Sequence, residues 1–336
     1  MVSFNIPREV TMRELTKTKL RDQLFERRQR LESAISDAGE AADLVRLLRE
    51  VDSALGRVDS GNFGTCLVCN LAIGDDLLAE NPMAQYCLCD LSRDQQIALQ
   101  HDLTLASHVQ LALLPKQNTR FAGWEAHFRY IPAGPVSGDY CDLVPRNDDT
   151  LFFLIGDVSG KGVAASLFMA RLNALFRSLL ETGSSATAMV EQANRLLADS
   201  AIPSHYATLV CGKAEESGRM EICNAGHCCP LLLRDGDVAP VESTGFPLGI
   251  FDTGPYEART IDLAPGDTLF LFTDGLSEAR NRSDQEYGTD RIADFLRENP
   301  GLPPQDLAAA CLRDVNSFLD GEPQTDDLTM MVLRKT

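Results

Sequence analysis

The stretch Leu154-Ile155-Gly156-Asp157-Val158-Ser159-Gly160-Lys161-Gly162 decides the fold, because an apolar run ends here in one aspartate and a glycine-rich turn. Residues 151–155 predict a buried strand, and residues 163–180 follow it with a long helical pattern. The turn is not a P-loop, since three residues rather than four separate its glycines and no Ser or Thr follows the lysine. It is not a dinucleotide-binding fingerprint, since valine takes the place of the second glycine. What remains is an acidic strand end, which predicts a cation site.

The composition of the chain is that of an ordinary globular protein. Of its 336 residues, 44% are apolar, and 24 Gly with 16 Pro are too few for a disordered or fibrous protein. This length accommodates one large domain and a smaller one. We see no signal peptide and no apolar run near the ~18 residues of a membrane span, so we expect a cytoplasmic protein with no membrane partner. Ten cysteines without a secretory signal then predict reduced thiols and metal ligands.

The net charge of −18 is unevenly distributed along the chain. Residues 1–60 hold 11 of the 31 basic and 11 of the 49 acidic residues, so the remainder carries 20 basic against 38 acidic residues. A surface that binds a phosphate backbone has the opposite sign. We therefore expect no direct nucleic-acid partner.

Residues 1–90 predict a helical hairpin followed by a small cysteine-rich knuckle. Two apolar stripes between residues 11 and 58 have helical spacing, and a turn around Gly39 separates them. Cys66 and Cys69 then form a C-x2-C pair, which supplies two thiolates on one tight turn as tetrahedral zinc requires. Residues 11–95 resemble the DksA/TraR zinc-finger family.

The knuckle departs from that family in its second half-site. Cys87 matches, but the family's last cysteine falls on Asp90, with Cys89 one residue early. Two interpretations stay open. One structural Zn²⁺ is held by Cys66, Cys69, Cys87 and either Cys89 or Asp90, or the knuckle is metal-free and held by packing. The hairpin does not clearly reproduce the family's acidic tip, so we do not transfer that family's action on RNA polymerase.

Residues 91–114 read as one helix, which Pro115 ends. Two adjacent apolar stripes give this helix an apolar face that is wider than contact with one other helix would cover. It is a linker buried between two domains, the seam of a homodimer, or both at once, and we expect a dimer through this helix. The predicted organisation is a hairpin and knuckle over residues 1–90, a linker over 91–115 and a larger domain over 116–336.

The larger domain alternates short β-rich segments with helical ones, which argues for the α+β class. The predicted helices cover residues 163–180, 184–199, 289–298 and 304–319. The predicted strands cover residues 124–130, 140–144, 151–155, 206–212, 219–223, 230–233, 256–263, 268–272 and 328–333.

Four aspartates in this domain lie at strand or turn boundaries, namely Asp139, Asp157, Asp274 and Asp326. A single acidic turn is usually a solvated loop or a helix cap. Four of them beside apolar strands predict convergence. Converging carboxylates repel one another unless a divalent cation neutralises them, and an all-oxygen set suits Mg²⁺ or Mn²⁺.

Seven motifs then follow in the order of a known family: Gln110–Pro115, Pro132–Asp142, Gly156–Gly162, Asn224–His227, Thr273–Gly275 with Glu278, Tyr287–Gly288 and Thr325–Thr329. On these motifs, residues 92–335 resemble the SpoIIE/RsbU-like branch of the metal-dependent (PPM) serine/threonine protein phosphatases. The resemblance implies an α-β-β-α sandwich with two Mn²⁺ or Mg²⁺ ions at one end. By position, Asp157 would bridge both ions with the help of the Val158 carbonyl. Asp274 and Asp326 would hold one ion, and Asp139 would complete the other.

This resemblance makes an enzyme the leading hypothesis. We expect a protein serine/threonine phosphatase that uses metal-activated water and is regulated by the N-terminal module. The expected substrate is a phosphorylated anti-sigma-factor antagonist or a similar bacterial signalling protein. The alternative is a non-catalytic scaffold that recruits RNA polymerase or another partner through the zinc-finger-like module. The four metal-position aspartates favour the enzyme, because a scaffold has no need to gather carboxylates that repel one another.

Four further residues have alternative roles. Asp142 either binds metal directly or supports the site from behind, and Asp327 orients its neighbour Asp326. His227 fits a hydrogen-bonded turn better than a catalytic role. Lys161 either attracts phosphate or belongs to a solvated loop.

Overall fold

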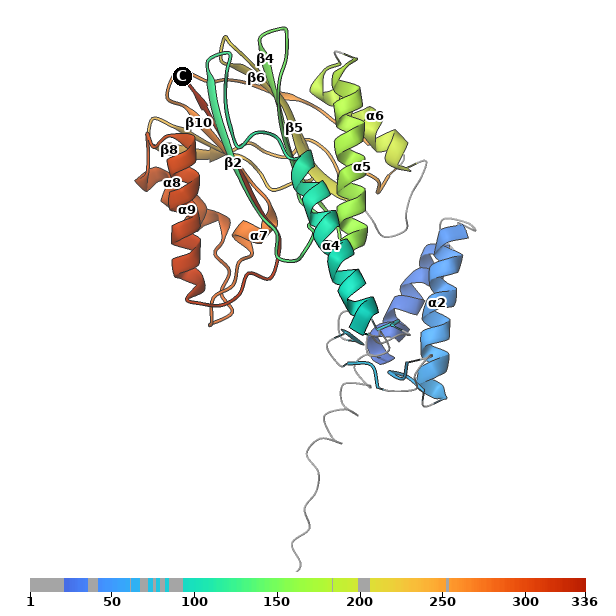
Figure 1. Ribbon diagram of the computed structural model, residues 1–336. Coiled ribbons are helices and arrows are strands. Elements are labelled where there is room, and N and C mark those ends of the chain that lie inside the picture. The colour runs from blue at the N-terminus through green and yellow to red at the C-terminus, as the bar shows by residue number, and fades with distance from the viewer. Residues whose placement is uncertain are drawn as a thin grey trace, which may run out of the picture. The chain divides into compact units, whose positions relative to one another are not determined.

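The computed structural model describes residues 21–35, 42–60, 62–66, 72–74, 77–78, 82–84, 93–182, 184–198, 206–251 and 254–336 (Figure 1). The chain divides into two compact units, Met1–Leu99 and Gln100–Thr336. Each unit has its own apolar core and is described by itself.

The first unit contains the predicted helical hairpin. A helix over residues 21–35 packs on α2 (Ala42–Asp59) through Leu24, Val51 and Ala54, all of which are buried. An ion pair of 2.9 Å between Arg28 Nε and Asp52 Oδ1 also links the two helices. Both helices of the predicted hairpin are thus present and pack on each other, whereas the turn between them lies outside the described residues.

The cysteine knuckle is described only in part. Cys66 is buried in the core of the first unit together with Phe63, Ile73 and Leu78. The other four candidate zinc ligands, which are Cys69, Cys87, Cys89 and Asp90, lie outside the described residues. The zinc site stays a prediction.

Two antiparallel sheets form the centre of the second unit. The six-stranded sheet has the order β1-β2-β11-β10-β7-β8, and the five-stranded sheet has the order β3-β4-β5-β6-β9. The strands are β1 (Asn118–Phe121), β2 (Trp124–Ile131), β3 (Tyr140–Pro145), β4 (Thr150–Val158), β5 (Ala207–Glu215), β6 (Arg219–Ala225), β7 (Leu231–Arg234), β8 (Asp237–Pro240), β9 (Arg259–Asp262), β10 (Thr268–Phe272) and β11 (Leu328–Lys335).

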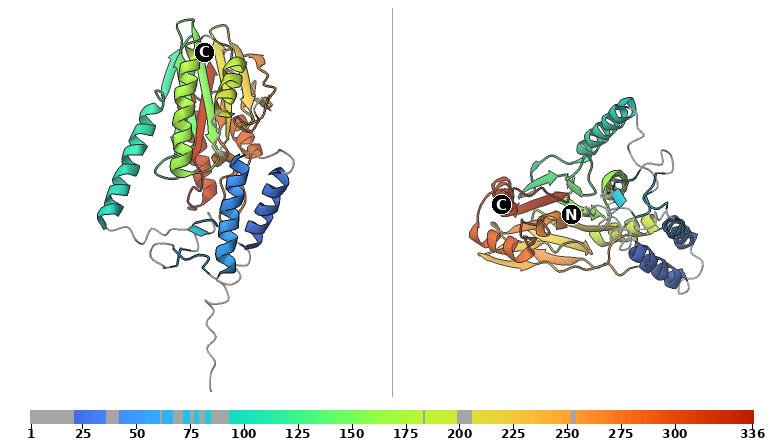
Figure 2. Two further views of the ribbon diagram at one scale, coloured as in Figure 1. Left: turned by 90° about the vertical axis from the view of Figure 1, so that its right-hand side faces the viewer. Right: turned by 90° about the horizontal axis from the view of Figure 1, so that it is seen from below.

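Helices cover the outer face of each sheet, as Figures 1 and 2 show. The five-stranded sheet packs against α5 (Gly162–Leu180) and α6 (Ala186–Ala198). The six-stranded sheet packs against α8 (Thr289–Glu298) and α9 (Pro304–Leu319). A third apolar cluster fills the space between the sheets. The α+β prediction and the α-β-β-α sandwich that the family resemblance implied are both confirmed.

Strand β4 shows why residues 151–155 are apolar without alternation. Leu151, Phe153 and Ile155 face the other sheet, whereas Phe152 and Leu154 face the helices α5 and α6. Successive side chains of a strand point to opposite faces, so a strand buried on both faces reads as a continuous apolar run.

Helix α5 is long and apolar enough to cross a membrane by length and composition alone. In this structure it is a layer of the sandwich, with Phe168, Met169, Leu172 and Phe176 buried against the five-stranded sheet.

The boundaries differ from the predictions mainly where elements are short. The short strands β1 and β8 and the one-turn helix α7 (Asp274–Ser277) were not predicted, and the segment 256–263 is a strand only over β9. Residues 235 and 236 form the tight turn between β7 and β8 with φ of 51° and 85°, the left-handed backbone of a type I′ hairpin. The linker helix α4 (Arg93–Leu113) agrees with its prediction.

The pairing of β4 with β5 generates a stability prediction. A Cβ atom on Gly212 would lie 2.1 Å from Cζ of Phe153, its partner across the ladder. We expect Gly212→Ala to lower the free energy of unfolding by ~1–3 kcal/mol, the range for overpacking a core. Urea unfolding followed by the fluorescence of Trp124, the single tryptophan, measures this change. In a Phe153→Leu background the same substitution should lower the free energy of unfolding by much less. An equal decrease in both backgrounds would contradict the steric cause.

Candidate metal centre

The four predicted aspartates lie at the ends of strands from both sheets. Asp139 directly precedes β3, and Tyr140 pairs with Gly156, the residue before Asp157 near the end of β4. Asp274 follows the end of β10 by two positions and starts α7. Asp326 lies two residues before β11, the partner of β10. The ladders therefore place two aspartates on each sheet at one end of the sandwich.

Asp139 links the two sheets through hydrogen bonds to its carboxylate. Thr273 Oγ1, after β10, donates to Asp139 Oδ2 at 2.9 Å, and Thr329 Oγ1, in β11, donates to the same oxygen at 2.5 Å. The second oxygen, Oδ1, is buried and has no hydrogen-bond partner among the residues that the structure describes. One half of this carboxylate is thus fixed, and the other half is left available to a cation.

Two glycines allow the turns that carry the aspartates to approach closely. A Cβ on Gly138 would lie 2.9 Å from the Val158 carbonyl oxygen and 3.4 Å from Asp157 Oδ1. A Cβ on Gly275 would lie 1.9 Å from the carbonyl oxygen of Asp327. Any side chain at either position would push the acidic segments apart, so glycine is required there by space.

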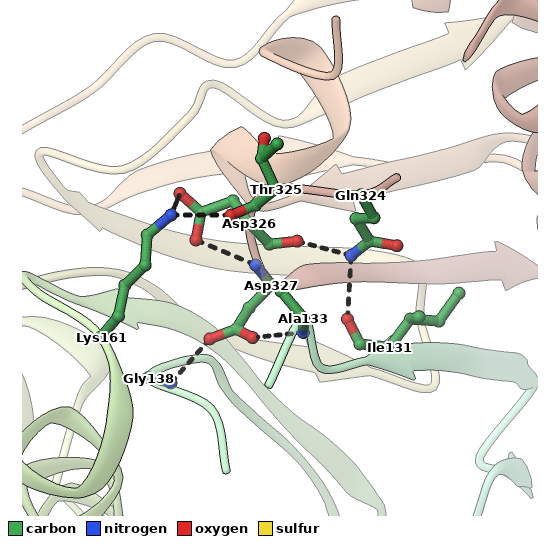
Figure 3. A network of polar contacts seen from close by, with 8 residues as sticks. All are labelled: Ile131, Ala133, Gly138, Lys161, Gln324, Thr325, Asp326 and Asp327. Atoms are coloured by element: carbon green, nitrogen blue, oxygen red, sulfur yellow. Dashed lines mark hydrogen bonds and ion pairs between the residues drawn. The ribbon is translucent and has the colours of Figure 1, made fainter. Parts of the chain in front are cut away.

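Asp327 holds the backbone of the turn that leads to Asp139. Its Oδ1 accepts the N–H of Ala133 at 2.8 Å, and its Oδ2 accepts the N–H of Gly138 at 2.9 Å (Figure 3). Gln324 Nε2 donates to the carbonyls of Ile131 and Asp326 and fixes the same turn from the other side. The prediction that Asp327 orients its neighbour is too narrow, because Asp327 positions the segment before β3.

Lys161 contacts the acidic turn directly. Its Nζ lies 3.0 Å from Asp326 Oδ2 and donates to the Thr325 carbonyl at 2.8 Å, as Figure 3 shows. Its side chain is therefore not simply solvated, as one of the two sequence interpretations had it.

Burial and mutual repulsion raise the proton affinity of the carboxylates. Burial first, and then the negative charges of Asp274 and Asp326, raise the pKa of Asp157 to about 8. Burial and the charge of Asp157 raise the pKa of Asp139 well above its usual value, and burial with Asp326 raises the pKa of Asp274. Neighbouring carboxylates affect one another's pKa only at close range.

These observations fit a divalent cation bound by oxygen ligands. The donor set consists of carboxylates, which suit Mg²⁺ and Mn²⁺, and Asp139 Oδ1 is a buried oxygen that lacks a partner. Asp139, Asp157, Asp274 and Asp326 are the residues that would hold such ions, together with the Val158 carbonyl beside Gly138. In the described part of the chain, no group of three or more Asp, Glu, His or Cys side chains lies close enough together to hold a metal ion without some rearrangement.

Asp142 is excluded as a ligand by its partners. Its carboxylate is fully buried and accepts the Arg177 guanidinium of α5 through two contacts of 2.6 Å, together with Tyr140 Oη at 3.2 Å. Its charge is therefore neutralised within the fold, and it ties β3 to α5.

His227 and Ser159 both act as structural residues. Asn224 Oδ1 accepts the His227 backbone N–H at 2.8 Å, and His227 Nδ1 lies 2.8 Å from Thr208 Oγ1. Burial lowers the pKa of His227 to about 4, which keeps the ring neutral. Ser159 Oγ accepts the backbone N–H of Tyr206. The interpretation of His227 as a hydrogen-bonded turn residue is confirmed.

Three supporting residues were missed from the sequence. Thr273 and Thr329 bind Asp139, and both lie within motifs that carry the family resemblance, although no role was predicted for either. Gln110, near the end of α4, donates to the Ser137 carbonyl at 2.6 Å and accepts the Ser137 N–H at 2.9 Å. Ser137 Oγ in turn accepts the N–H of Asp139, so the linker helix reaches the site through one intervening residue.

Comparisons with known proteins agree with this architecture. The solved SiaA-PP2C domain of Pseudomonas aeruginosa superposes with a TM-score of 0.63 at 23% identity, over 71% of this chain and 97% of that domain. The RsbU and RsbW domains of Rv1364c from Mycobacterium tuberculosis superpose with a TM-score of 0.57 at 28% identity, over 66% of this chain and 61% of theirs. Fold and site together define a PP2C-type phosphatase domain.

The family follows from the sequence comparison. The model of the family "Stage II sporulation protein E (SpoIIE)" matches residues 147–336, more than half of the chain. The chain belongs to the SpoIIE family. Phosphoserine phosphatase RsbU of Bacillus subtilis is 25% identical over 246 residues, 72% of each protein. Protein IcfG of Synechocystis sp. is 28% identical over 265 residues, which cover 69% of this chain but 41% of IcfG.

The raised pKa of Asp157 generates a prediction about pH and stability. Because the folded state binds this proton more tightly than the unfolded state, the group stabilises the fold fully below about pH 4. That contribution is lost as the pH rises through about 8. In EDTA, the Tm of Asp157→Asn should therefore exceed that of the wild type by more at pH 8 than at pH 5. Thermal unfolding measures this difference, and a difference that is constant with pH would contradict the assignment.

Proposed function

We propose that this protein is a metal-dependent phosphatase that removes phosphate from serine or threonine of a protein. The observation that carries the proposal is that four strand-end aspartates lie at one end of the sandwich and that neighbouring acids raise the pKa of Asp139 and Asp157. The buried Asp139 Oδ1 also has no hydrogen-bond partner among the described residues. Membership of the SpoIIE family and the name of its relative RsbU, a phosphoserine phosphatase, support the same activity.

The side chains of the site act by holding and orienting rather than by attack. Asp139, Asp157, Asp274 and Asp326 would hold the ions. The two threonines that donate to Asp139 Oδ2 fix that oxygen and leave Oδ1 for a cation. Bound Mn²⁺ or Mg²⁺ would lower the pKa of a bound water and neutralise phosphoryl oxygens. Water activated by metal needs no covalent nucleophile from the protein. Ser159, next to the site in sequence, accepts the backbone N–H of Tyr206 with its Oγ.

The proposed substrate is a phosphorylated anti-sigma-factor antagonist. The resemblance to the SpoIIE/RsbU-like phosphatases supports this choice, and so does the shared domain type in RsbU and Rv1364c. The exposed end of the sandwich suits a protein rather than a small molecule, because Lys161 and Asp326 are 61% and 39% exposed at the mouth of the site.

We further propose that the N-terminal module regulates the site through α4 and that α4 forms a homodimer. Leu105 and Val109 on this helix are 54% and 56% exposed, which is unusual for large apolar side chains without a partner. Gln110 of the same helix binds the segment before Asp139. A displacement of α4 could therefore reach Asp139, one of the predicted metal ligands, through the contacts of Gln110 and Ser137.

The scaffold alternative has less support. Gathering Asp139, Asp157 and Asp274 raises the proton affinity of each, which costs stability near neutral pH. A binding module gains nothing from that cost, whereas a metal-dependent enzyme requires the ligands.

The activity is tested with Mn²⁺ and p-nitrophenyl phosphate, and then with a phosphoserine protein. We expect hydrolysis by the wild type and a loss of more than ~100-fold in kcat/KM for Asp157→Asn, because even residues that only support metal ligands cost ~10–100-fold. Asp148→Asn is the matched control, since Asp148 is an exposed acid paired with Lys213 away from the site. Equal rates for the wild type and Asp157→Asn would refute the proposed activity.

The dimer is tested by sedimentation of the whole chain. We expect Leu105→Glu to shift the protein from dimer to monomer, because a charge would enter an apolar seam. Thr104→Glu is the control, since Thr104 is an exposed polar residue of the same helix and bonds only to the Gln100 carbonyl one turn away. If the wild-type protein sediments as a monomer, the proposed homodimer is wrong.

A further inference from the structure

Lys161 makes an ion pair with one metal-position carboxylate. Its Nζ lies 3.0 Å from Asp326 Oδ2, and it also donates to the Thr325 carbonyl (Figure 3). Its positive charge also acts on Asp274, where it partly opposes the rise in the pKa of that carboxyl group. A cation of the protein's own is thus bound at the place where a divalent ion is expected.

The position of Lys161 in the fold is not explained by helix stability. It is the N-cap of α5 and makes no side-chain capping hydrogen bond. The N-terminus of a helix favours negative charge, so a lysine there is unfavourable for the helix itself. Gly160 and Gly162 on either side have φ of 92° and 76°, and a Cβ atom at either position would have nothing within 4 Å of it. The segment therefore has room to carry the lysine away from the turn.

The acidic turn does not depend on Lys161 for its shape. Asp326 Oδ1 accepts the N–H of Asp327 at 2.9 Å, and Gln324 Nε2 binds the Asp326 carbonyl. Asp327 is held by two backbone N–H groups of the neighbouring loop. Within the described part of the chain, Lys161 contacts Asp326 Oδ2 and the Thr325 carbonyl, whereas Oδ1 is held by the N–H of Asp327, so the departure of Lys161 leaves the carboxylate in place.

The strength of the ion pair suits an exchangeable contact. Both side chains are more than one third exposed, and exposed ion pairs contribute little because water screens them. A divalent cation with several carboxylates around it interacts far more strongly with Asp326 than one screened ammonium does.

We propose that Lys161 is a positioning residue that occupies Asp326 in the metal-free protein and yields this carboxylate to a divalent cation. The inference rests on the proposed function, since it takes Asp326 as a metal ligand. Lys161 and the metal then compete for Asp326 Oδ2. Its ammonium neutralises the acidic turn before metal arrives and is released beside the site when metal binds.

Isothermal titration calorimetry of Mn²⁺ into the metal-free whole chain tests the competition. We expect Lys161→Met to bind Mn²⁺ about fivefold more tightly than the wild type, the factor that corresponds to an exposed ion pair at the upper end of its usual range. Lys161→Arg, which keeps the cation, should stay within about twofold of the wild type. Lys213→Met removes a lysine paired with Asp148, outside the site, and should also leave the affinity unchanged.

A double-mutant cycle separates competition from the general effect of removing a positive charge. In an Asp326→Asn background, Lys161→Met should no longer change Mn²⁺ affinity, because the contested carboxylate is gone. If the effect persists in that background, or if Lys161→Met binds Mn²⁺ no more tightly than the wild type, the inference is overturned while the proposed function stands. A wild type that binds no Mn²⁺ would overturn both.

Discussion

Electrostatic repulsion among the carboxylates at one end of the sandwich is the constraint on which the rest of the structure depends. Burial is the largest cause of the raised pKa of Asp139 and Asp157. The charge of Asp157 adds to the rise at Asp139, and the charges of Asp274 and Asp326 add to the rise at Asp157. Left to itself, such a group of acids would move apart into water, where each charge is solvated. Because the carboxylates repel one another, other interactions of the fold must hold them together.

Two sets of interactions do this. Three apolar layers fix the ends of β3, β4, β10 and β11 at one edge, because the strands cannot shift in register without moving their side chains to the wrong face. Hydrogen bonds then cross between the sheets at that edge. Thr273 and Thr329 fix Asp139 from the six-stranded sheet, and Asp327 reaches back to the backbone of Gly138. The apolar core supplies the stability, and these few polar contacts set the geometry.

Much of this arrangement could be predicted from the sequence, because it depends on local patterns. The apolar run in β4, the helical spacing of α5 and the acidic motifs at strand ends all follow from neighbouring residues. Short elements such as β1 and β8 carry too few residues for a period to be seen. The contact between Lys161 and Asp326 joins residues far apart in the chain, and the partners of Asp139 come from strands of the other sheet. Pairings of this kind depend on tertiary structure, which a single sequence does not encode in its spacing.

The acids near the site differ in how their charges are balanced, and this difference assigns their roles better than their sequence motifs do. Asp142 lies in a matching motif, yet the Arg177 guanidinium neutralises it within the core, and it has no capacity left for a metal. Both carboxylate oxygens of Asp327 accept hydrogen bonds from backbone N–H groups. Asp139 keeps one buried oxygen without a partner, and Asp157 has carboxylates as its charged neighbours. A buried acid whose charge the fold leaves unbalanced takes up a proton or a cation from outside, and Asp139 and Asp157 meet this condition. Asp326 differs from them, because Lys161 pairs with it in the metal-free protein.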